Sequence, residues 1–306
     1  MRMKILTCAV LAACALFGGE VGLARGKNAV LPADAFTVAI DVQPEAVRGG
    51  GIPGMVAWFG NGWDYGFRLR MSPKDHGFMP SLEISKGPRN GSYVLEARDA
   101  IMPAGLKSHF VATWDGKTAR IYLNGKMVAE GTHAVPLVRA KGLNWGVGGP
   151  SYGLAGFKFK TTGVRLWDAA LPATDVKALA DAMQVVDARD VAKYLAVPFE
   201  KRVEDYVSGT SDPCFAGLMK QLIFNALSSG RDLRLPTALL KAFAESMPND
   251  APSVACDFRL RFAAASLREG DRAAARAYLK RAEKMAGPEN REFDYRRAAE
   301  LRRMLQ

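Results

Sequence analysis

Two turn dipeptides, Asp115-Gly116 and Asn124-Gly125, interrupt the apolar segment HFVATWDGKTARIYLNGKMVAEG, which runs from His109 to Gly131. Asp-Gly and Asn-Gly favour tight chain reversals because these residues adopt a positive φ at little cost. On either side of each dipeptide, successive residues alternate between the two faces of an extended chain, which is the period of a β-strand. The segment therefore predicts a three-stranded antiparallel meander with one buried face.

Strand-like sequence extends over the region from Ala35 to about Leu171. Further alternating runs, separated by Gly, Asn, Asp and Pro, occupy 36–42, 55–59, 65–71, 81–85, 93–97, 143–148 and 155–167. Strands at this frequency, with no helical segment between them, are typical of two packed antiparallel sheets. We therefore expect an antiparallel β-sandwich in this half of the chain.

The sequence pattern changes to a helical one from about Pro172. Apolar residues recur at helical spacing in 175–183, 188–206, 213–227 and 235–246, and the tail 256–306 reads as three helices. Asp212-Pro213 is a typical helix start, since Asp can cap the first turn and Pro fits its geometry. The predicted fold is thus a sandwich domain over 25–182 followed by an α-helical domain over 183–306.

The tail contains the small-residue spacing of one tetratricopeptide-like repeat. The matching positions are Ala263, Gly270, Asp271, Ala275, Ala282 and Pro288. Pro288 is one place late, the bulky aromatic positions are weak, and a stable solenoid needs about three repeats. A single tetratricopeptide-like hairpin and a plain helical hairpin therefore both stay open.

The first 24 residues read as a signal peptide. Met1 to Lys4 is basic, and the apolar run that follows is too short to span a bilayer. Small residues up to Ala24 suit cleavage after that residue, which predicts an exported protein, either periplasmic, outer-surface or secreted. A lipobox-like sequence before Cys14 leaves a lipid anchor at Cys14 as an alternative. No later segment reads as a membrane span.

Two cysteines, Cys214 and Cys256, remain beyond the signal peptide. An even pair in an exported protein favours a disulfide, and two separate buried thiols are the alternative. No Cys-x-x-Cys motif or nearby His completes a zinc site.

The net charge of +11 is spread along the chain without a block of like charge. Such a surface favours anionic polymers at long range. Because the sequence lacks a basic stripe and a recognition motif, we do not predict nucleic-acid binding.

The meander, followed by LNWGVGG and GLAGFKFKTTGVRLWDAALPATDVKAL, resembles the laminin-G-like branch of the concanavalin A-like lectin/glucanase superfamily. Members carry a His-Val-Ala-x-Thr-Tyr-Asp-Gly-like strand and turn, then a strand ending in Asp-Gly or Asn-Gly. The resemblance covers about residues 35–182 and implies a jelly roll of two antiparallel sheets. Thr162 and Gly163 stand where members often carry acidic residues, so no role of that carboxylate is carried over.

The sequence shows no catalytic motif. Glucanases on this fold use two or three carboxylates on one face of one strand, whereas 81–86 carries only Glu83. Glu96 and Asp99 are three residues apart, which places them on opposite faces of a strand. No nucleophile elbow occurs, and the three histidines lack metal-ligand spacing. We therefore predict a protein that is not an enzyme, and a packing role for His109.

The candidate ligand-binding residues are aromatic and polar side chains near turns: Trp63, Asp64, Tyr65, Arg89, Asn90, Trp145 and Tyr152. Aromatic faces stack on the apolar faces of sugars, and polar side chains bind the hydroxyl groups. Trp63 folding back over the sandwich is the alternative. The other tryptophans, Trp58, Trp114 and Trp167, lie within strands and are expected in the core.

The predicted function is an exported, non-catalytic carbohydrate-binding protein that recognises a polysaccharide or glycan through its jelly-roll loops. One alternative is an envelope structural module whose helical domain binds a protein partner. Another is a glycan-active hydrolase or lyase with an unrecognised site. Some superfamily members hold Ca²⁺, for which Asp64 or Asp115 could serve, but an oxygen cage needs several ligands from distant loops. No cofactor is predicted, and Ca²⁺ stays an open alternative.

Overall fold

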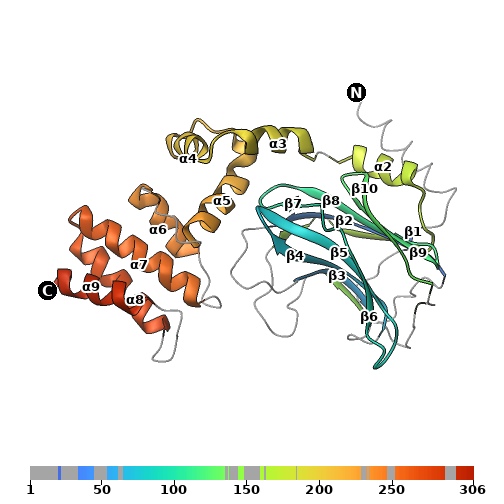
Figure 1. Ribbon diagram of the computed structural model, residues 1–306, viewed down its shortest axis with the longest axis horizontal. Coiled ribbons are helices and arrows are strands. Elements are labelled where there is room, and N and C mark those ends of the chain that lie inside the picture. The colour runs from blue at the N-terminus through green and yellow to red at the C-terminus, as the bar shows by residue number, and fades with distance from the viewer. Residues whose placement is uncertain are drawn as a thin grey trace. The chain divides into compact units, whose positions relative to one another are not determined.

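The computed structural model describes residues 20–21, 34–44, 54–60, 65–134, 137, 144–147, 159–161, 163–183, 185–228, 233, 235–246, 252–286 and 294–306. Contacts within the chain form two compact units. The first comprises Met1–Val47, Gly51–Arg202 and Ser211–Leu222, and the second comprises Arg48–Gly50, Val203–Thr210 and Ile223–Gln306. The first holds the strands in Figure 1.

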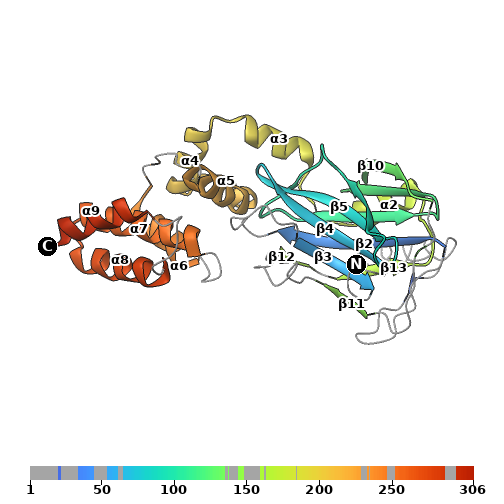
Figure 2. The ribbon, with the colours of Figure 1, turned by 60° about the horizontal axis from the view of Figure 1, so that its bottom comes forward.

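Two antiparallel sheets build the first unit, as predicted. The seven-stranded sheet has the order β1-β13-β2-β8-β9-β10, with β12 beside β2, and the six-stranded sheet has the order β11-β3-β4-β5-β6, with β7 beside β5. The first set has the bounds β1 Glu20–Val21, β2 Phe36–Pro44, β8 Ser108–Trp114, β9 Thr118–Leu123, β10 Lys126–Thr132, β12 Phe159–Lys160 and β13 Val164–Trp167. The second has β3 Gly54–Gly60, β4 Phe67–Lys74, β5 Gly77–Ser85, β6 Ser92–Glu96, β7 Met102–Pro103 and β11 Asn144–Val147. Figure 2 shows the two layers at another angle.

The predicted meander is confirmed as β8, β9 and β10, which pair antiparallel in chain order. Asn124 and Gly125 have φ angles of 51° and 78°, the left-handed conformation that this dipeptide adopts readily. At the other turn, Oδ1 of Asp115 accepts hydrogen bonds from the backbone N–H groups of Lys117 and Thr118. The two dipeptides therefore act as turn residues, as the sequence indicates.

Aromatic rings from both sheets meet in the core of the sandwich. Phe36 of β2 and Phe67 of β4 stack at a centroid distance of 3.8 Å, and Phe59 of β3 stacks on Phe67 at 4.8 Å. Trp114 lies against Phe36 and is buried, as expected. Burying each such ring contributes roughly 1.5–3 kcal/mol, so these side chains hold the two sheets together.

Helix α2 (Ala173–Asp181) covers part of the outer face of the seven-stranded sheet. Val176 and Leu179 of the helix pack in one cluster with Trp167 and Tyr122 of the sheet. Trp167 is therefore buried as predicted, but beneath a helix and not between the sheets. His109 lies buried in this sheet, with Nδ1 2.8 Å from Oδ1 of Asp41, in line with a packing role.

Further helical segments belong wholly or partly to the first unit: α3 (Ala188–Ala196), the start of α4 (Phe199–Ser208), the 3₁₀ turn η1 (Pro213–Phe215) and the start of α5 (Ala216–Ser228). Leu106 packs in one cluster with Val191 and Leu218. The compact unit therefore extends beyond residue 182. The domain boundary predicted at that residue stays a prediction.

The segment 188–206, whose apolar residues recur at helical spacing, forms two helices, α3 and α4 (Phe199–Ser208). Val197 has an extended ψ of 135°, and Pro198 follows it. Proline disfavours the helical conformation of the preceding residue and lacks an N–H group, so the first helix ends there. The predicted start at Pro213 is confirmed, because Asp212 Oδ1 accepts from the Cys214 N–H group.

The second unit contains α6 (Thr237–Ser246), α7 (Pro252–Arg268), α8 (Arg272–Ala286) and α9 (Tyr295–Leu305). Helices α7 and α8 form a hairpin that turns at Gly270, with φ of 84°. Ala263, Ala275 and Ala282 are fully buried. The three helices expected in the tail are present, and the tetratricopeptide-like identity of the hairpin stays a prediction.

The predicted disulfide between Cys214 and Cys256 is absent, since both are free thiols. Cys214 is exposed in η1. Cys256 is buried in α7, where its Sγ donates to the carbonyl of Ala282 in α8 at 3.3 Å. The thiol that the disulfide would need is thus enclosed between α7 and α8, and burial raises the pKa of Cys256.

None of the helices in the described part of the chain is both long and apolar enough to span a bilayer. Strand β1 falls within the segment that the sequence identifies as a signal peptide, and it pairs with β13.

Replacing Gly217 with Ala should destabilise the first unit. A Cβ atom at Gly217 would lie 2.7 Å from the Cα of Gly105, so α5 would have to move away from the sandwich. Alanine favours helix more than glycine does, so any loss comes from the steric clash. We expect the free energy of unfolding to fall by about 1–3 kcal/mol in urea denaturation. An unchanged or higher stability would contradict this close packing.

Candidate functional site

Four of the predicted ligand-binding residues lie at one end of the six-stranded sheet. Cross-strand pairing aligns Trp145, Phe59, Phe67, Ile84 and Tyr93 in one row, so the ends of β3 and β5 lie at the same edge of the sheet as the starts of β4 and β6. We call this end the loop end. It carries Tyr65, Arg89, Asn90 and Trp145. The other three candidates, Trp63, Asp64 and Tyr152, lie outside the described residues.

The aromatic candidates at the loop end pack inward. Trp145 stacks on Phe59 at a centroid distance of 6.2 Å, and Tyr65 lies half-buried against the same core. Arg89 and Asn90 are exposed in the β5–β6 turn. The described part of the loop end thus offers polar groups and no exposed aromatic face.

His133 is buried beside the loop end. Its ring stacks on Tyr93 at 4.5 Å, and its carbonyl accepts a hydrogen bond from Nε1 of Trp114. Burial lowers the pKa of His133 from its ordinary value, and the charge of Lys86 lowers it further. The imidazole is therefore a neutral packing group at neutral pH.

A row of side chains crosses the face of the six-stranded sheet that is turned away from the core, here called the outer face. Inward residues Phe67, Leu69 and Met71 alternate with outward Arg68 and Arg70 along β4. The row is made by Gly146, Trp58, Arg68, Glu83 and Val94, on five neighbouring strands.

Trp58 is half-buried on the outer face and does not belong to the core, contrary to expectation. The expectation rested only on the position of Trp58 within a strand. Its neighbours Ala57 and Phe59 point into the core, so alternation along β3 places Trp58 on the opposite face. A better signal was available in the charged residues of neighbouring strands. Arg68 and Glu83 each stand between two apolar residues, which marks the outer face that Trp58 shares.

The indole of Trp58 lies across the neighbouring strand β11. A Cβ atom built on Gly146 would lie 2.7 Å from both Cε2 and Nε1 of Trp58 and 2.8 Å from Cζ2. Several ring atoms at equal distance from one point indicate that the ring rests on Gly146 with its face. Any larger residue at 146 would tilt the indole away from the sheet.

Glu83 joins two arginines beside this tryptophan. Its Oε1 is 3.1 Å from Nη1 of Arg68, and its Oε2 is 2.6 Å from Nη1 of Arg70. The side chains of Arg68 and Glu83 are 3% and 5% exposed, whereas that of Arg70 is 17% exposed. The buried pair of Arg68 and Glu83 thus holds the guanidinium of Arg70 in place through the second carboxylate oxygen.

The described residues contain no group of three His, Cys, Asp or Glu side chains that could hold a metal ion. Asp115, one of the two carboxylates considered for Ca²⁺, caps its own turn and pairs with Arg120 at 3.0 Å. These contacts lower the pKa of Asp115 despite the opposing effect of burial. Asp64, the other one, lies outside the described residues.

A family model described as the Concanavalin A-like lectin/glucanases superfamily matches residues 18–177. The chain belongs to this superfamily. The match covers the two sheets and most of α2. No curated protein is similar enough to match the chain.

Solved structures give further likenesses to this concanavalin A-like chain. The native heptameric SAP-like pentraxin from Limulus polyphemus is 18% identical, with 54% of this chain and 79% of that one covered and a TM-score of 0.39. The Ruminococcus gnavus IT-sialidase CBM40 bound to α2,6-sialyllactose is 15% identical, with 53% and 100% covered and a TM-score of 0.41. Domain 4 of the extracellular GH43 arabinanase AbnA from Geobacillus stearothermophilus, in complex with arabinotriose, is 19% identical, with 49% and 68% covered and a TM-score of 0.38.

Replacing Glu83 with Ala should cost about 3–5 kcal/mol of unfolding free energy, because Arg68 and Arg70 would lose their shared carboxylate in a largely buried place. Glu96→Ala is the matched control. Its carboxylate pairs with the exposed Arg98, so its removal should cost less than about 1 kcal/mol. Urea denaturation of both variants measures this difference, and equal losses would contradict a structural role of Glu83.

Acid should destabilise the sandwich in part through His133. A pKa lowered by folding means that the unfolded chain takes up the proton first. The neutral His133 contributes its full share of the folding stability above pH 6.5, the ordinary pKa of histidine, and this share is lost as the pH falls below that value. We expect the drop in stability between about pH 7.5 and pH 5.5 to be smaller in His133→Gln. An equal drop in both proteins would show that His133 does not contribute.

Proposed function

We propose that this chain is an exported, non-catalytic carbohydrate-binding protein whose ligand is a polysaccharide or glycan. The observation that carries the proposal is the indole of Trp58, which rests on Gly146 on the same face of the sheet as Arg70, the arginine that Glu83 holds. Membership of a lectin and glucanase superfamily is consistent with it.

The outer face combines the two kinds of contact that sugars need. An indole held against a sheet can accept the apolar C–H face of a sugar ring. Arg70 can donate hydrogen bonds to sugar hydroxyl groups, and Glu83 fixes its geometry before a ligand arrives. Neighbouring strands are about 5 Å apart, so groups on β11, β3 and β4 span about 10 Å, the reach of one or two sugar units.

The arrangement of carboxylates favours binding without hydrolysis. Glycoside hydrolysis needs one carboxylic acid to donate a proton and a second carboxylate to attack or to activate water. Both oxygens of Glu83 are bound by guanidinium groups. Glu96, on the adjacent strand, pairs with Arg98. Neither is poised to exchange a proton with a sugar.

Export is part of the proposal because the chain starts with a basic, then apolar, then small-residue segment ending at Ala24. Mass spectrometry of the mature protein from the cell envelope and medium tests it. A mature N-terminus near residue 25 would support secretion, a lipidated Cys14 would support an anchor, and an intact Met1 in the cytoplasm would refute export.

Trp58→Ala should weaken binding to the retained polysaccharide at least tenfold, since losing one stacked aromatic anchor costs about 2 kcal/mol or more. The measurement is affinity electrophoresis in a panel of polysaccharides, followed by titration with the best one. Val94→Ala, an exposed change on the same face, is the matched control and should bind normally. The double variant Arg89→Ala/Asn90→Ala tests the loop end separately.

Each outcome of this experiment decides between named alternatives. Loss of binding in the Arg89/Asn90 variant, with Trp58→Ala unchanged, would move the site to the loop end. Absence of binding to any polysaccharide or glycan would refute the carbohydrate proposal and favour a protein-interaction role. Release of new reducing ends by the purified protein would refute the non-catalytic part.

A further inference from the structure

A cavity lies at the end of the sandwich opposite to the loop end. Strand β5 begins beside His76 and ends beside Lys86, so the β4–β5 turn that holds His76 is at the end opposite to Arg89 and Asn90. There a pocket of about 620 Å³ opens between the strands and helix α3. Its volume falls within the roughly 300–1,000 Å³ typical of small-molecule sites.

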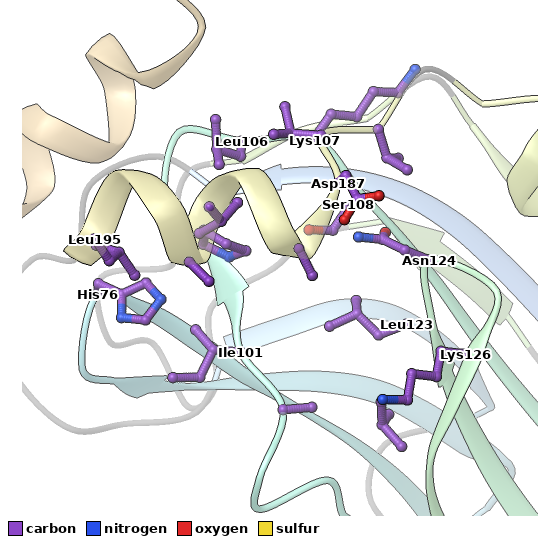
Figure 3. Close-up of a pocket in the computed structure, with 18 of the residues that line it drawn as sticks. His76, Ile101, Leu106, Lys107, Ser108, Leu123, Asn124, Lys126, Asp187 and Leu195 are labelled. Carbon is purple, nitrogen blue, oxygen red and sulfur yellow. The ribbon is translucent and has the colours of Figure 1, made fainter. Parts of the chain in front are cut away.

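The wall of this pocket is mainly aliphatic (Figure 3). Ile101 and Leu123 come from the sandwich side, and Val191, Ala192 and Leu195 come from α3. Leu123 also packs against the sandwich core, so the pocket continues the core toward solvent. No Phe, Tyr or Trp is among the described residues that line it. The described lining therefore suits an aliphatic chain and offers no platform for a sugar ring.

Hydrogen-bond donors lie along one side of the pocket. Figure 3 shows Ser108 and Asn124 close together near Asp187, Lys126 farther along that side beyond Leu123, and His76 at the opposite end. The Ser108 hydroxyl is buried and has no hydrogen-bond partner among the described residues. Oδ1 of Asn124 already accepts from the His109 N–H group, so Asn124 offers a ligand its amide N–H groups.

The negative charge of Asp187 is already compensated. The carboxylate of Asp187 accepts from the backbone N–H group of Arg189 and lies 2.8 Å from its guanidinium. These contacts lower the pKa of Asp187 to about 2, so it is ionised and paired. At the far end, burial lowers the pKa of His76, which favours the neutral ring. Lys126 and Lys107 add two cations to the lining, and Asp99 adds one further carboxylate.

We propose that this pocket binds an aliphatic carboxylate of medium chain length, with the chain along Leu123 and α3 and the carboxylate at Ser108, Asn124 and Lys126. The site is separate from the outer face and shares no residue with it. The two ligands would therefore bind independently.

The test uses the full-length protein and two probes of equal chain length, dodecanoate and dodecanol, titrated by calorimetry below their aggregation concentrations. Dodecanoate should bind with one-to-one stoichiometry. Ala192→Trp fills the pocket from an exposed position of α3 and should weaken binding of both probes at least about tenfold. Ala196→Trp, on the same helix but outside the lining, is its matched control and should bind like the parent.

A second pair of variants tests the carboxylate end. Lys126→Ala should weaken dodecanoate about tenfold, as expected for a lost charged hydrogen bond, and leave dodecanol unchanged. Lys193→Ala is the control, because Lys193 pairs with Asp190 away from the lining. Failure of dodecanoate to bind, or binding that Ala192→Trp leaves intact, would overturn the pocket assignment. Equal affinities of the two probes, unaffected by Lys126→Ala, would overturn the carboxylate assignment.

Discussion

The stacking of Phe36 on Phe67 joins the two sheets, and the rest of the first unit depends on that contact. Because the residues on the inward faces of both sheets form an aromatic core, the residues that alternate with them along each strand point outward. This alternation places Arg68 and Glu83 on the outer face, where they meet across β4 and β5. The same constraint sends Trp167 to the face that α2 covers. The outer face of the six-stranded sheet and the contact between Trp167 and α2 therefore both follow from the packing of the inward-facing residues.

Local sequence signals predict the framework of this fold well. Asn124-Gly125 forms the turn expected of it, and Asp212 caps the turn that begins at Pro213. Such features depend on a few adjacent residues, so they are visible without the rest of the chain. The helical spacing over 188–206 is confirmed by α3 and α4, and the break between these helices also has a local cause, since Pro198 follows the end of α3.

The candidate site was harder to predict because it depends on pairing between strands. Nothing near Gly146 in the sequence shows that the indole of Trp58 rests on it, because that contact depends on the pairing of β11 with β3. The expected disulfide failed similarly. The composition of the chain suggested a pair, whereas packing of α7 against α8 encloses Cys256 next to Ala282. Long-range contacts decided both cases.

The pocket between the strands and α3 was also beyond prediction from the sequence, because it too depends on long-range contacts. Its lining comes from the turn at His76, the strand ends at Ser108 and Leu123, and helix α3, which are distant in sequence and individually unremarkable. A buried hydroxyl without a partner at Ser108 costs free energy unless something completes it. The core continues into an open aliphatic space beside that hydroxyl. A ligand with an apolar body and one acceptor group would satisfy both conditions at once, whereas a sugar, with hydroxyl groups on all sides, would leave most of its polar groups against aliphatic walls.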